Sequence, residues 1–207
     1  MEPYNHHNKK TNTFLLQYFY MNTRIEKNGV EHYMLKEIYE QRNVIHATIS
    51  FLHSISHRFS DYLGFPIEHL KDLNSIHIVG AGTSWHVGKI AQFFFESITL
   101  LPTKVSLASE FRYTAFFPEQ HYLHLMISQS GETADTLEAM RFINSMSIPT
   151  LALTNVASSS IVREVGGFLL TQAGREIVVA STKAFSTQLT SFILAGSSHC
   201  TSKRYYY

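Results

Sequence analysis

The chain lacks several features that define whole classes of protein. Cys200 is the only cysteine among 207 residues, so an internal disulfide is excluded, as suits a reducing cytoplasm. No apolar run reaches the roughly 18 residues of a membrane-spanning helix. The formal net charge is only +1, without the basic excess that attracts nucleic acid or an anionic membrane. We therefore predict a cytoplasmic protein with neither a nucleic acid nor a membrane as partner.

The two ends of the chain differ in pattern from its middle. Residues 13–21, TFLLQYFYM, follow two lysines as in a signal peptide, but NTRIEKNG comes next instead of a small-residue cleavage site. We interpret residues 1–30 as a disordered or linker-like start and residues 199–207 as an unrelated tail. Apolar residues make up 44% of the chain, a normal share for a globular core. The pattern predicts one domain over residues 31–198, including a helical lead-in.

Hydrophobic periodicity divides this middle part into helices and strands. Residues 31–60 carry apolar side chains mostly three, four or seven apart and contain no proline or glycine, which predicts one long helix or two broken ones. Further on, short apolar strands alternate with helices. The expected strands are 75–80, 104–109, 122–128, 149–155 and 167–172, and the expected helices are 84–99, 133–146, 158–165 and 181–196. This alternation predicts an α/β fold with a parallel sheet covered on both faces.

Ligands of such sheets bind at the carboxyl ends of the strands, where each strand turns into a helix. The first of these turns, GAGTSWHVGK, is rich in glycine, but it fits neither of two familiar nucleotide patterns. The third glycine of a dinucleotide fingerprint is replaced by Trp85, and Ile90 follows the lysine where a P-loop needs serine or threonine. What remains is a helix start with two hydroxyls, Thr83 and Ser84, which either cap the helix or contact a ligand.

The second turn, SQSGET, carries more hydroxyls than a helix cap needs. Ser128, Gln129, Ser130 and Thr133 surround Gly131 just before a predicted helix. A cap uses one hydroxyl. Several neutral donors at a helix N-terminus suit a phosphate dianion, since each hydrogen bond to a charged group contributes about 1.5–3 kcal/mol and the helix end adds roughly 0.3–1 kcal/mol. The turn therefore predicts a phosphate-ester site, and its donors can also bind sugar hydroxyls.

Charged residues near the other turns give weaker signals. Lys183, in the stretch EIVVASTKAFSTQL, could place a cation near the site, but a solvated or ion-paired surface lysine is the favoured interpretation. Glu110 and Arg112 follow a predicted strand and either line the site or pair with each other. Spacing does not decide between these two arrangements.

Two other kinds of site find no support in the sequence. His53 and His57 are four residues apart, but there is no H-E-x-x-H motif and no third ligand in view. No G-x-S-x-G elbow is present, which argues against a serine hydrolase. We expect neither a metal nor a cofactor.

Several stretches together resemble the sugar isomerase (SIS) domain family. The matching stretches are HYMLKEIYEQ, GAGTSWH, ASEFRY, SQSGETADTL, LTNVASSSIVRE and AGREIVVASTKAFSTQL, and they span about residues 31–196. SQSGET is typical of SIS domains broadly, whereas KEIYEQ, ASEFRY and ASTKAF point to the first SIS half of glucosamine-6-phosphate synthases, the isomerising glutamine–fructose-6-phosphate aminotransferases. The resemblance implies a flavodoxin-like α/β/α sandwich with a five-stranded parallel sheet, preceded by N-terminal helices.

The resemblance also implies a ligand and its contacts. The ligand would be fructose 6-phosphate, which these enzymes convert to glucosamine 6-phosphate in amino-sugar biosynthesis. Ser128, Gln129, Ser130 and Thr133 would hold the phosphate, Thr83 and Ser84 would contact the phosphate or sugar, and Val179 and Ser181 would close over the sugar.

Departures from the family pattern limit what this chain is expected to do alone. Glu2 follows Met1 where the family has a nucleophilic cysteine, and no glutaminase domain, second SIS domain or C-terminal tail of the family is recognisable. We therefore expect a fragment that is inactive by itself, with no assignable catalytic residue, which self-associates or pairs with a second SIS domain. The alternatives are a non-catalytic module that senses a sugar phosphate and a non-functional remnant.

Overall fold

The computed structural model describes residues 27, 29–70, 72–114 and 122–203. Most of the predicted disordered start, residues 1–30, lies outside these ranges. The first described element is the long helix α2 (Tyr33–Ile55), so of the two predicted alternatives, one long helix or two broken ones, the structure has the long helix. Three short turns of helix follow it: η1 (Ser56–Arg58), α3 (Ser60–Leu63) and η2 (Ile67–Leu70). α3 ends at Gly64, whose left-handed backbone conformation is favourable for glycine.

Five parallel strands form one sheet, as predicted. They are β1 (Ser75–Gly80), β2 (Thr103–Leu107), β3 (Tyr122–Ser128), β4 (Thr150–Thr154) and β5 (Gly167–Leu170). Their order in the sheet is β2-β1-β3-β4-β5. The direction of winding reverses between β1 and β3, and at such a reversal the connections on the two sides diverge and leave room for a ligand.

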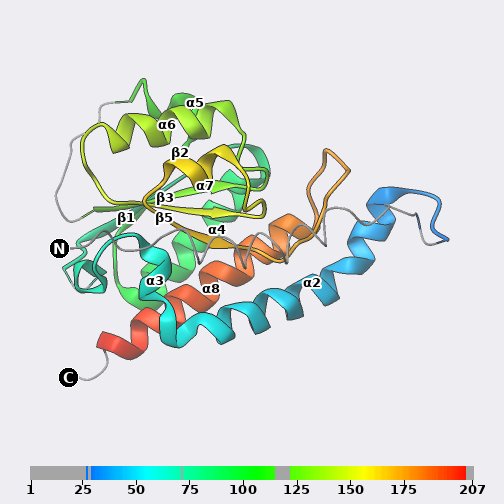
Figure 1. Ribbon diagram of the computed structural model, residues 1–207, viewed down its shortest axis with the longest axis horizontal. Coiled ribbons are helices and arrows are strands. Elements are labelled where there is room, and N and C mark those ends of the chain that lie inside the picture. The colour runs from blue at the N-terminus through cyan, green and yellow to red at the C-terminus, as the bar shows by residue number, and fades with distance from the viewer. Residues whose placement is uncertain (1–26, 28, 71, 115–121, 204–207) are drawn as a thin grey trace.

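Helices cover both faces of this sheet and complete the α/β/α sandwich (Figure 1). One face carries α5 (Ala108–Phe111), α6 (Ala134–Asn144) and α7 (Ser160–Glu164). The other face carries α4 (Gly82–Thr99) and α8 (Lys183–Lys203), with α2 packed against α8 on the outside. The prediction of an α/β/α fold with a helical lead-in is therefore confirmed.

Several predicted boundaries differ from those of the structure, most by one or two residues, and two of the differences change the assignment of a segment. The second strand ends at Leu107 rather than residue 109, because Ala108 begins the short helix α5, which the sequence pattern did not indicate. The last helix runs on to Lys203 instead of ending near residue 196, so part of the predicted tail, residues 199–203, is helical.

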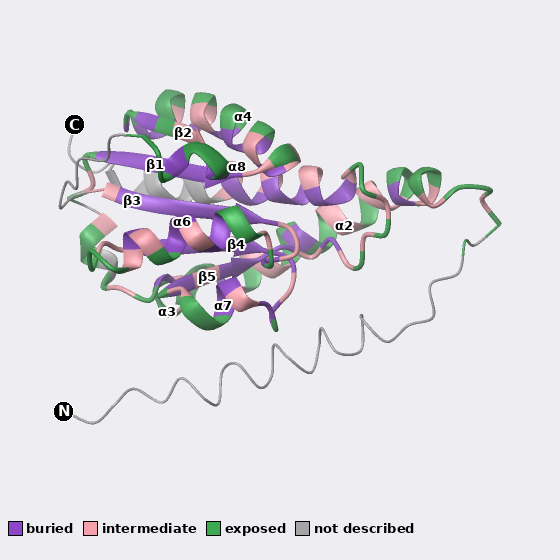
Figure 2. Ribbon diagram, turned by 90° about the horizontal axis from the view of Figure 1, so that it is seen from above, coloured by how far each residue is buried: buried purple, intermediate pink, exposed green. Residues whose placement is uncertain are grey.

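The core lies on the two faces of the sheet, because successive side chains of each strand point to opposite sides. On one side, Ile76 and Ile78 of β1 pack with Val87 and Phe95 of α4. On the other side, Val79 and Met126 pack with apolar residues of α5 and α6. Figure 2 shows the central strands buried and the outer faces of the helices exposed. Residues buried on both faces fix the sheet, and with it the positions where the strands end.

Candidate functional site

The two hydroxyl-bearing turns lie side by side at the carboxyl edge of the sheet. Gly80, the last residue of β1, is in register with Ile127, and β3 ends one residue later at Ser128. The turns that follow therefore emerge from neighbouring strands at the winding reversal, and this is the part of such a fold where ligands bind.

The SQSGET turn is organised around the hydroxyl of Ser128. This side chain is 3% exposed, and its Oγ lies 3.0 Å from Thr133 Oγ1 and accepts a hydrogen bond of 3.0 Å from the Gly131 N–H. Ser130 is half-buried, and its Oγ accepts a hydrogen bond of 3.2 Å from the Glu132 N–H. The hydroxyls thus fold the turn onto itself, and each hydroxyl keeps a hydrogen or a lone pair for another partner.

Gly131 sets the shape of this turn. Its φ of +67° lies in the left-handed region, which other residues adopt only with strain. A Cβ added there would lie 2.8 Å from Ile161 Cγ2 and closer still to Ser159. The Gly131 carbonyl also accepts a hydrogen bond of 3.1 Å from the Ile161 N–H. The turn therefore packs tightly against the start of α7, and only glycine fits.

The helices that follow the two turns begin without a side-chain cap. The N-cap residues are Ala81 for α4 and Thr133 for α6, and neither makes a side-chain cap hydrogen bond. Thr83 and Ser84 therefore do not cap α4. Both lie inside α4, where Ser84 is buried and its Oγ donates to Gln188 Oε1 of α8 at 3.3 Å. The amides and positive dipole ends of two neighbouring helices are thus directed at one edge, an arrangement that favours an anion.

Glu132, the acidic residue of the turn, serves the next helix rather than this edge. Its Oε1 accepts a hydrogen bond of 2.7 Å from the Ser160 N–H at the start of α7. This backbone hydrogen bond is the main cause that lowers the pKa of Glu132 below its ordinary value. The carboxylate of Glu132 is thus engaged by the start of α7.

Asn155 links the turn to the third loop, and sequence reasoning missed it. Its backbone N–H donates to Gln129 O at 3.1 Å, while its side-chain Nδ2 donates to Gly174 O at 2.7 Å. Its Oδ1 accepts a hydrogen bond of 3.0 Å from the Ala173 N–H. An asparagine directly after a strand, within LTN, was the signal that could have revealed it. Through the backbone and the side chain of this one residue, the position of Gln129 is tied to residues 173–174.

The third loop, residues 173–182, holds the last two predicted site residues in different environments. Ser181 is half-buried and donates from Oγ to Glu176 Oε2 at 3.0 Å, and Glu176 Oε1 accepts from the Thr182 N–H at 2.9 Å. Val179 is 101% exposed and packs against no other predicted site residue. The structure thus brings the residues of the first two turns together and leaves Val179 facing solvent.

Two charged residues have partners other than those expected. Lys183 makes an ion pair, but it is not at the surface: its side chain is 5% exposed and lies 2.7 Å from Glu40 of α2. The expectation of a surface lysine is wrong because α2 covers the start of α8. Arg112 lies 3.3 Å from Glu138 of α6, so it pairs with neither Glu110 nor the hydroxyl turns in the described part of the chain.

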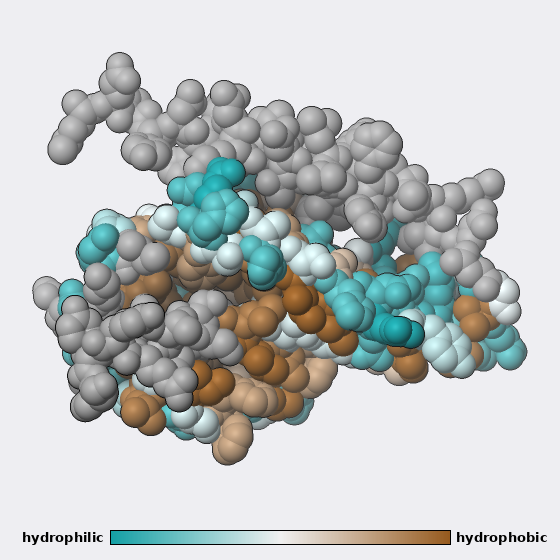
Figure 3. All heavy atoms as spheres, turned by 90° about the horizontal axis from the view of Figure 1, so that it is seen from below, coloured by the Kyte–Doolittle hydropathy of each residue, from teal (hydrophilic) through white to brown (hydrophobic). Residues whose placement is uncertain are grey.

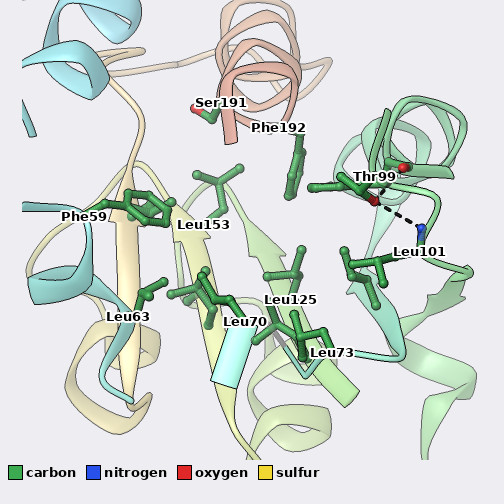
Figure 4. Close-up of a pocket in the computed structure, with 16 residues that line it drawn as sticks. Phe59, Leu63, Leu70, Leu73, Thr99, Leu101, Leu125, Leu153, Ser191 and Phe192 are labelled. Atoms are coloured by element: carbon green, nitrogen blue, oxygen red, sulfur yellow. Dashed lines mark hydrogen bonds between the residues drawn. The ribbon is translucent and has the colours of Figure 1, made fainter. Parts of the chain in front are cut away.

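An apolar cavity lies away from both turns. It measures about 80 Å³ and is lined mainly by leucine and phenylalanine side chains from the strands, α3, α4 and α8 (Figure 4). Its lining includes Leu73, Leu101 and Leu123, which lie at or before the amino ends of β1, β2 and β3. The hydroxyls that border it are satisfied: Thr99 bonds Phe95 O, and Ser191 bonds Thr187 O. This cavity offers nothing to a charged ligand.

Metal ligands and membrane spans were sought in the residues that the structure describes. They contain no group of three or more histidine, cysteine, aspartate or glutamate side chains arranged to hold a metal ion. None of their helices is long and apolar enough to cross a membrane.

Comparisons with known proteins agree with this geometry. Residues 69–197 match the family described as SIS domain. The chain is 45% identical over 174 residues to the isomerising glutamine–fructose-6-phosphate aminotransferase of Acinetobacter baylyi, covering 81% of this chain and 28% of that protein. It is 44% identical over 183 residues to the protein of the same name from Legionella pneumophila strain Lens, covering 87% of this chain and 30% of the relative.

A solved structure gives the same result. The C-terminal domain of glucosamine-fructose-6-phosphate aminotransferase from Francisella tularensis superimposes with a TM-score of 0.75 at 38% identity, covering 87% of this chain and 50% of that one. The chain spans less than a third of the length of the two curated relatives. The family match extends over more than half of the chain and includes both hydroxyl turns and the third loop. The chain therefore belongs to the SIS domain family.

Proposed function

We propose that this chain binds the phosphate ester of a sugar, fructose 6-phosphate or glucosamine 6-phosphate, at the carboxyl edge of β1 and β3. The observation that carries the proposal is the pairing of two uncapped helix starts with the hydroxyls of the SQSGET turn at the winding reversal of the sheet. This arrangement supplies many neutral donors, which suits a dianion held by hydrogen bonds.

Each predicted site residue has a role in this proposal. The hydroxyls of Ser128, Ser130 and Thr133, with Gln129, hold the phosphate oxygens. Ser84 donates its hydrogen to Gln188 of α8, so its oxygen is left to accept a hydrogen bond from a sugar hydroxyl. Thr83 contacts the phosphate or the sugar. Ser181 and Val179 contact the sugar from the third loop. We assign no catalytic acid, base or nucleophile to the chain.

The proposed biological role is sugar-phosphate binding within glutamine–fructose-6-phosphate aminotransferase, in cytoplasmic amino-sugar synthesis. The names of the similar proteins support this role. The chain aligns with only 28–30% of those relatives, so we propose for it the binding part of their reaction and not the whole conversion.

The proposed macromolecular partner is a second copy of the chain or another SIS domain. Apolar side chains gather on the face of the molecule seen from below (Figure 3). Phe93 of α4 is 69% exposed and Ile49 of α2 is 39% exposed. Exposed apolar surface of this kind is typical of interfaces. Light scattering at micromolar concentration should give a mass above that of a monomer, and a monomer would contradict this part of the proposal.

The experiment that tests the ligand is a calorimetric titration of the purified chain with fructose 6-phosphate. Fructose controls for the sugar without its phosphate, and NAD controls for nucleotide binding at a glycine-rich turn. Binding of the phosphate ester alone is the expected result. A folded chain that binds none of the three would overturn the proposed site.

A further inference from the structure

Three polar side chains of α2 hold a segment that follows them by some 140 residues. They are Glu37, Glu40 and Gln41; the last two follow Glu37 by three and four residues and so lie on the same side of the helix as Glu37. Each has a partner in the third loop or the start of α8: Ile177 and Val178 for Glu37, Lys183 for Glu40, and Ser186 for Gln41. In Figure 1 the loop stands beside the half of α2 that extends beyond the sandwich.

Glu37 makes the central contact. Its Oε1 accepts a hydrogen bond of 2.6 Å from the Ile177 N–H and a longer one of 3.4 Å from the Val178 N–H. The residue is only 2% exposed, and its other oxygen, Oε2, has no hydrogen-bond partner among the described residues. A half-satisfied buried carboxylate is unfavourable for folding. Fold stability alone therefore does not explain why an acidic residue occupies this position.

The neighbouring contacts fix the start of α8. Glu40 lies 2.7 Å from Lys183 Nζ and 3.3 Å from Lys36 Nζ. Burial opposes the charge of Glu40, but the hydrogen bond and charge of Lys183, with Lys36 behind it, lower the pKa of Glu40 below its ordinary value. The Ser186 hydroxyl donates to Gln41 Oε1 one turn further along α8.

The middle of the third loop depends on Glu37 more than its two ends do. One end is held by Asn155, which bonds Ala173 and Gly174. The other end is held by Glu176, which bonds Ser181 and Thr182. Between them, Ile177 is 41% exposed and Val179 is 101% exposed. Among the described residues, Glu37 supplies the side-chain hydrogen bonds to the backbone of Ile177 and Val178.

We infer that Glu37 is a positioning residue, which orders the third loop so that it closes over the sugar part of the ligand. This inference rests on the proposed function, because the sugar is assigned to Val179 and Ser181 of that loop. Without Glu37, ligand binding would have to order residues 177–179, and this entropy cost weakens affinity. The phosphate would be unaffected, since the SQSGET turn holds it independently of α2.

The test compares two ligands on four forms of the full chain. Affinities for inorganic phosphate and for fructose 6-phosphate are measured for the wild type and for Glu37→Ala, Glu37→Gln and Glu96→Ala. Glu37→Gln keeps one acceptor oxygen for the Ile177 amide. Glu96→Ala is a matched control, because Glu96 Oε1 likewise accepts a backbone N–H, that of Thr103 at 3.1 Å, but far from the third loop. Amide hydrogen exchange at Ile177 and Val178 is followed in parallel.

The expected result is a loss confined to the sugar. Glu37→Ala should weaken fructose 6-phosphate binding by about tenfold, the equivalent of one hydrogen bond, and should leave the affinity for inorganic phosphate within about twofold. Exchange at Ile177 and Val178 should accelerate, Glu37→Gln should recover most of the affinity, and Glu96→Ala should match the wild type. If Glu37→Ala does not fold, Glu37→Asp takes its place, because it keeps the charge but is one methylene too short to reach Ile177.

Two other results would overturn the inference in distinguishable ways. If the folded Glu37→Ala or Glu37→Asp variant binds fructose 6-phosphate as the wild type does, the positioning role is wrong and the sugar-phosphate site stands. If the wild type binds neither ligand, the proposed function fails and the inference fails with it.

Discussion

The edge that carries the SQSGET turn and the apolar cavity make different uses of the same strands. At the carboxyl ends of β1 and β3, hydroxyls and two uncapped helix starts gather. Toward the amino ends, on the face covered by α4 and α8, leucine and phenylalanine side chains enclose about 80 Å³ (Figure 4).

The two regions differ in the polar groups that they can offer to a ligand. The hydroxyls that border the cavity are already bonded within the protein. The turn offers polar groups and oriented amides. For a phosphate ester, the donors decide the site, because a dianion gains nothing from an apolar wall.

The largest effect is expected from filling the space that Gly131 leaves empty. Gly131→Ala combines a left-handed φ with a clash against Ser159 and Ile161, so it should lower the free energy of unfolding by about 3–4 kcal/mol. Gly82→Ala is the control, since its φ is also positive, at +52°, but nothing lies within 4 Å of the added carbon; it should cost only about 1 kcal/mol. Urea denaturation measures both. Equal losses would show that the turn does not pack tightly against α7.

The next effect concerns ligand binding alone. Ser130→Ala should weaken phosphate-ester binding by roughly 1.5–3 kcal/mol with little loss of stability, because within the described ranges the Ser130 hydroxyl bonds only its own turn, at the Glu132 amide. Ser158→Ala, an exposed serine near the start of α7, is the matched control and should bind normally. Calorimetry with fructose 6-phosphate gives the readout. Unchanged affinity together with reduced stability would make Ser130 a structural residue of the turn.

Acidic pH should lower the free energy of unfolding of the whole domain, which contains both the site and the cavity. His77 and His124 face each other on β1 and β3 with ring centroids 5.3 Å apart. Burial lowers the pKa of His124 to about 4, and burial together with the nearby His124 and Lys104 lowers the pKa of His77 to about 3. Both values lie below the unfolded value near 6.5, so the unfolded chain takes up protons first as the pH falls.

The free energy of unfolding should therefore decrease by about 1.4 kcal/mol per pH unit for each of these two histidines below pH 6.5. The lowered pKa values of Glu40 and Glu164 act only below their ordinary value of 4.5, so the window from pH 6.5 to pH 5 isolates the histidines. Denaturation across this window measures the slope, and His124→Leu should roughly halve it. A slope that the variant leaves unchanged would contradict the assignment.

The smallest effect should come from the cavity. Ser191 of α8 is 2% exposed and borders it, and Ser191→Met would fill part of the space with a flexible apolar side chain. We expect a gain of about 1 kcal/mol in stability and the same affinity for fructose 6-phosphate. Thermal unfolding and calorimetry check the two halves of this prediction. Weaker sugar-phosphate binding would link the cavity to the site.

The sequence predicts the sheet well because the pattern of apolar residues that marks a strand lies within a short stretch of chain. The strand of residues 122–128 is found with the predicted bounds, since a run of apolar residues ending in a hydroxyl turn has no helical alternative of that length. The short helix α5 escapes prediction, because four residues carry too little periodicity. The extension of α8 also escapes, since no proline or glycine signal marks its end.

The residue types of the candidate site can be predicted from the sequence, but the contacts that hold them in place cannot. The hydroxyls that the sequence places around Gly131 are the basis of the ligand prediction. Asn155 and Glu37 act on backbone groups far along the chain, Glu37 across 140 residues. Such contacts depend on which helix packs against which loop, and no local pattern encodes that. The surface position expected for Lys183 is wrong for the same reason, because α2 buries this side chain by packing against α8.

The central claim is that a phosphate ester binds at the hydroxyl edge and not in the apolar cavity. The most direct measurement is the change in backbone amide chemical shifts of the labelled chain as fructose 6-phosphate is added. The account predicts that residues 81–84 and 128–136 shift first and most, while the cavity-lining Leu125, Leu153 and Phe192 stay unchanged. Shifts concentrated at those three residues, or no shift at the two turns in a folded chain, would contradict it.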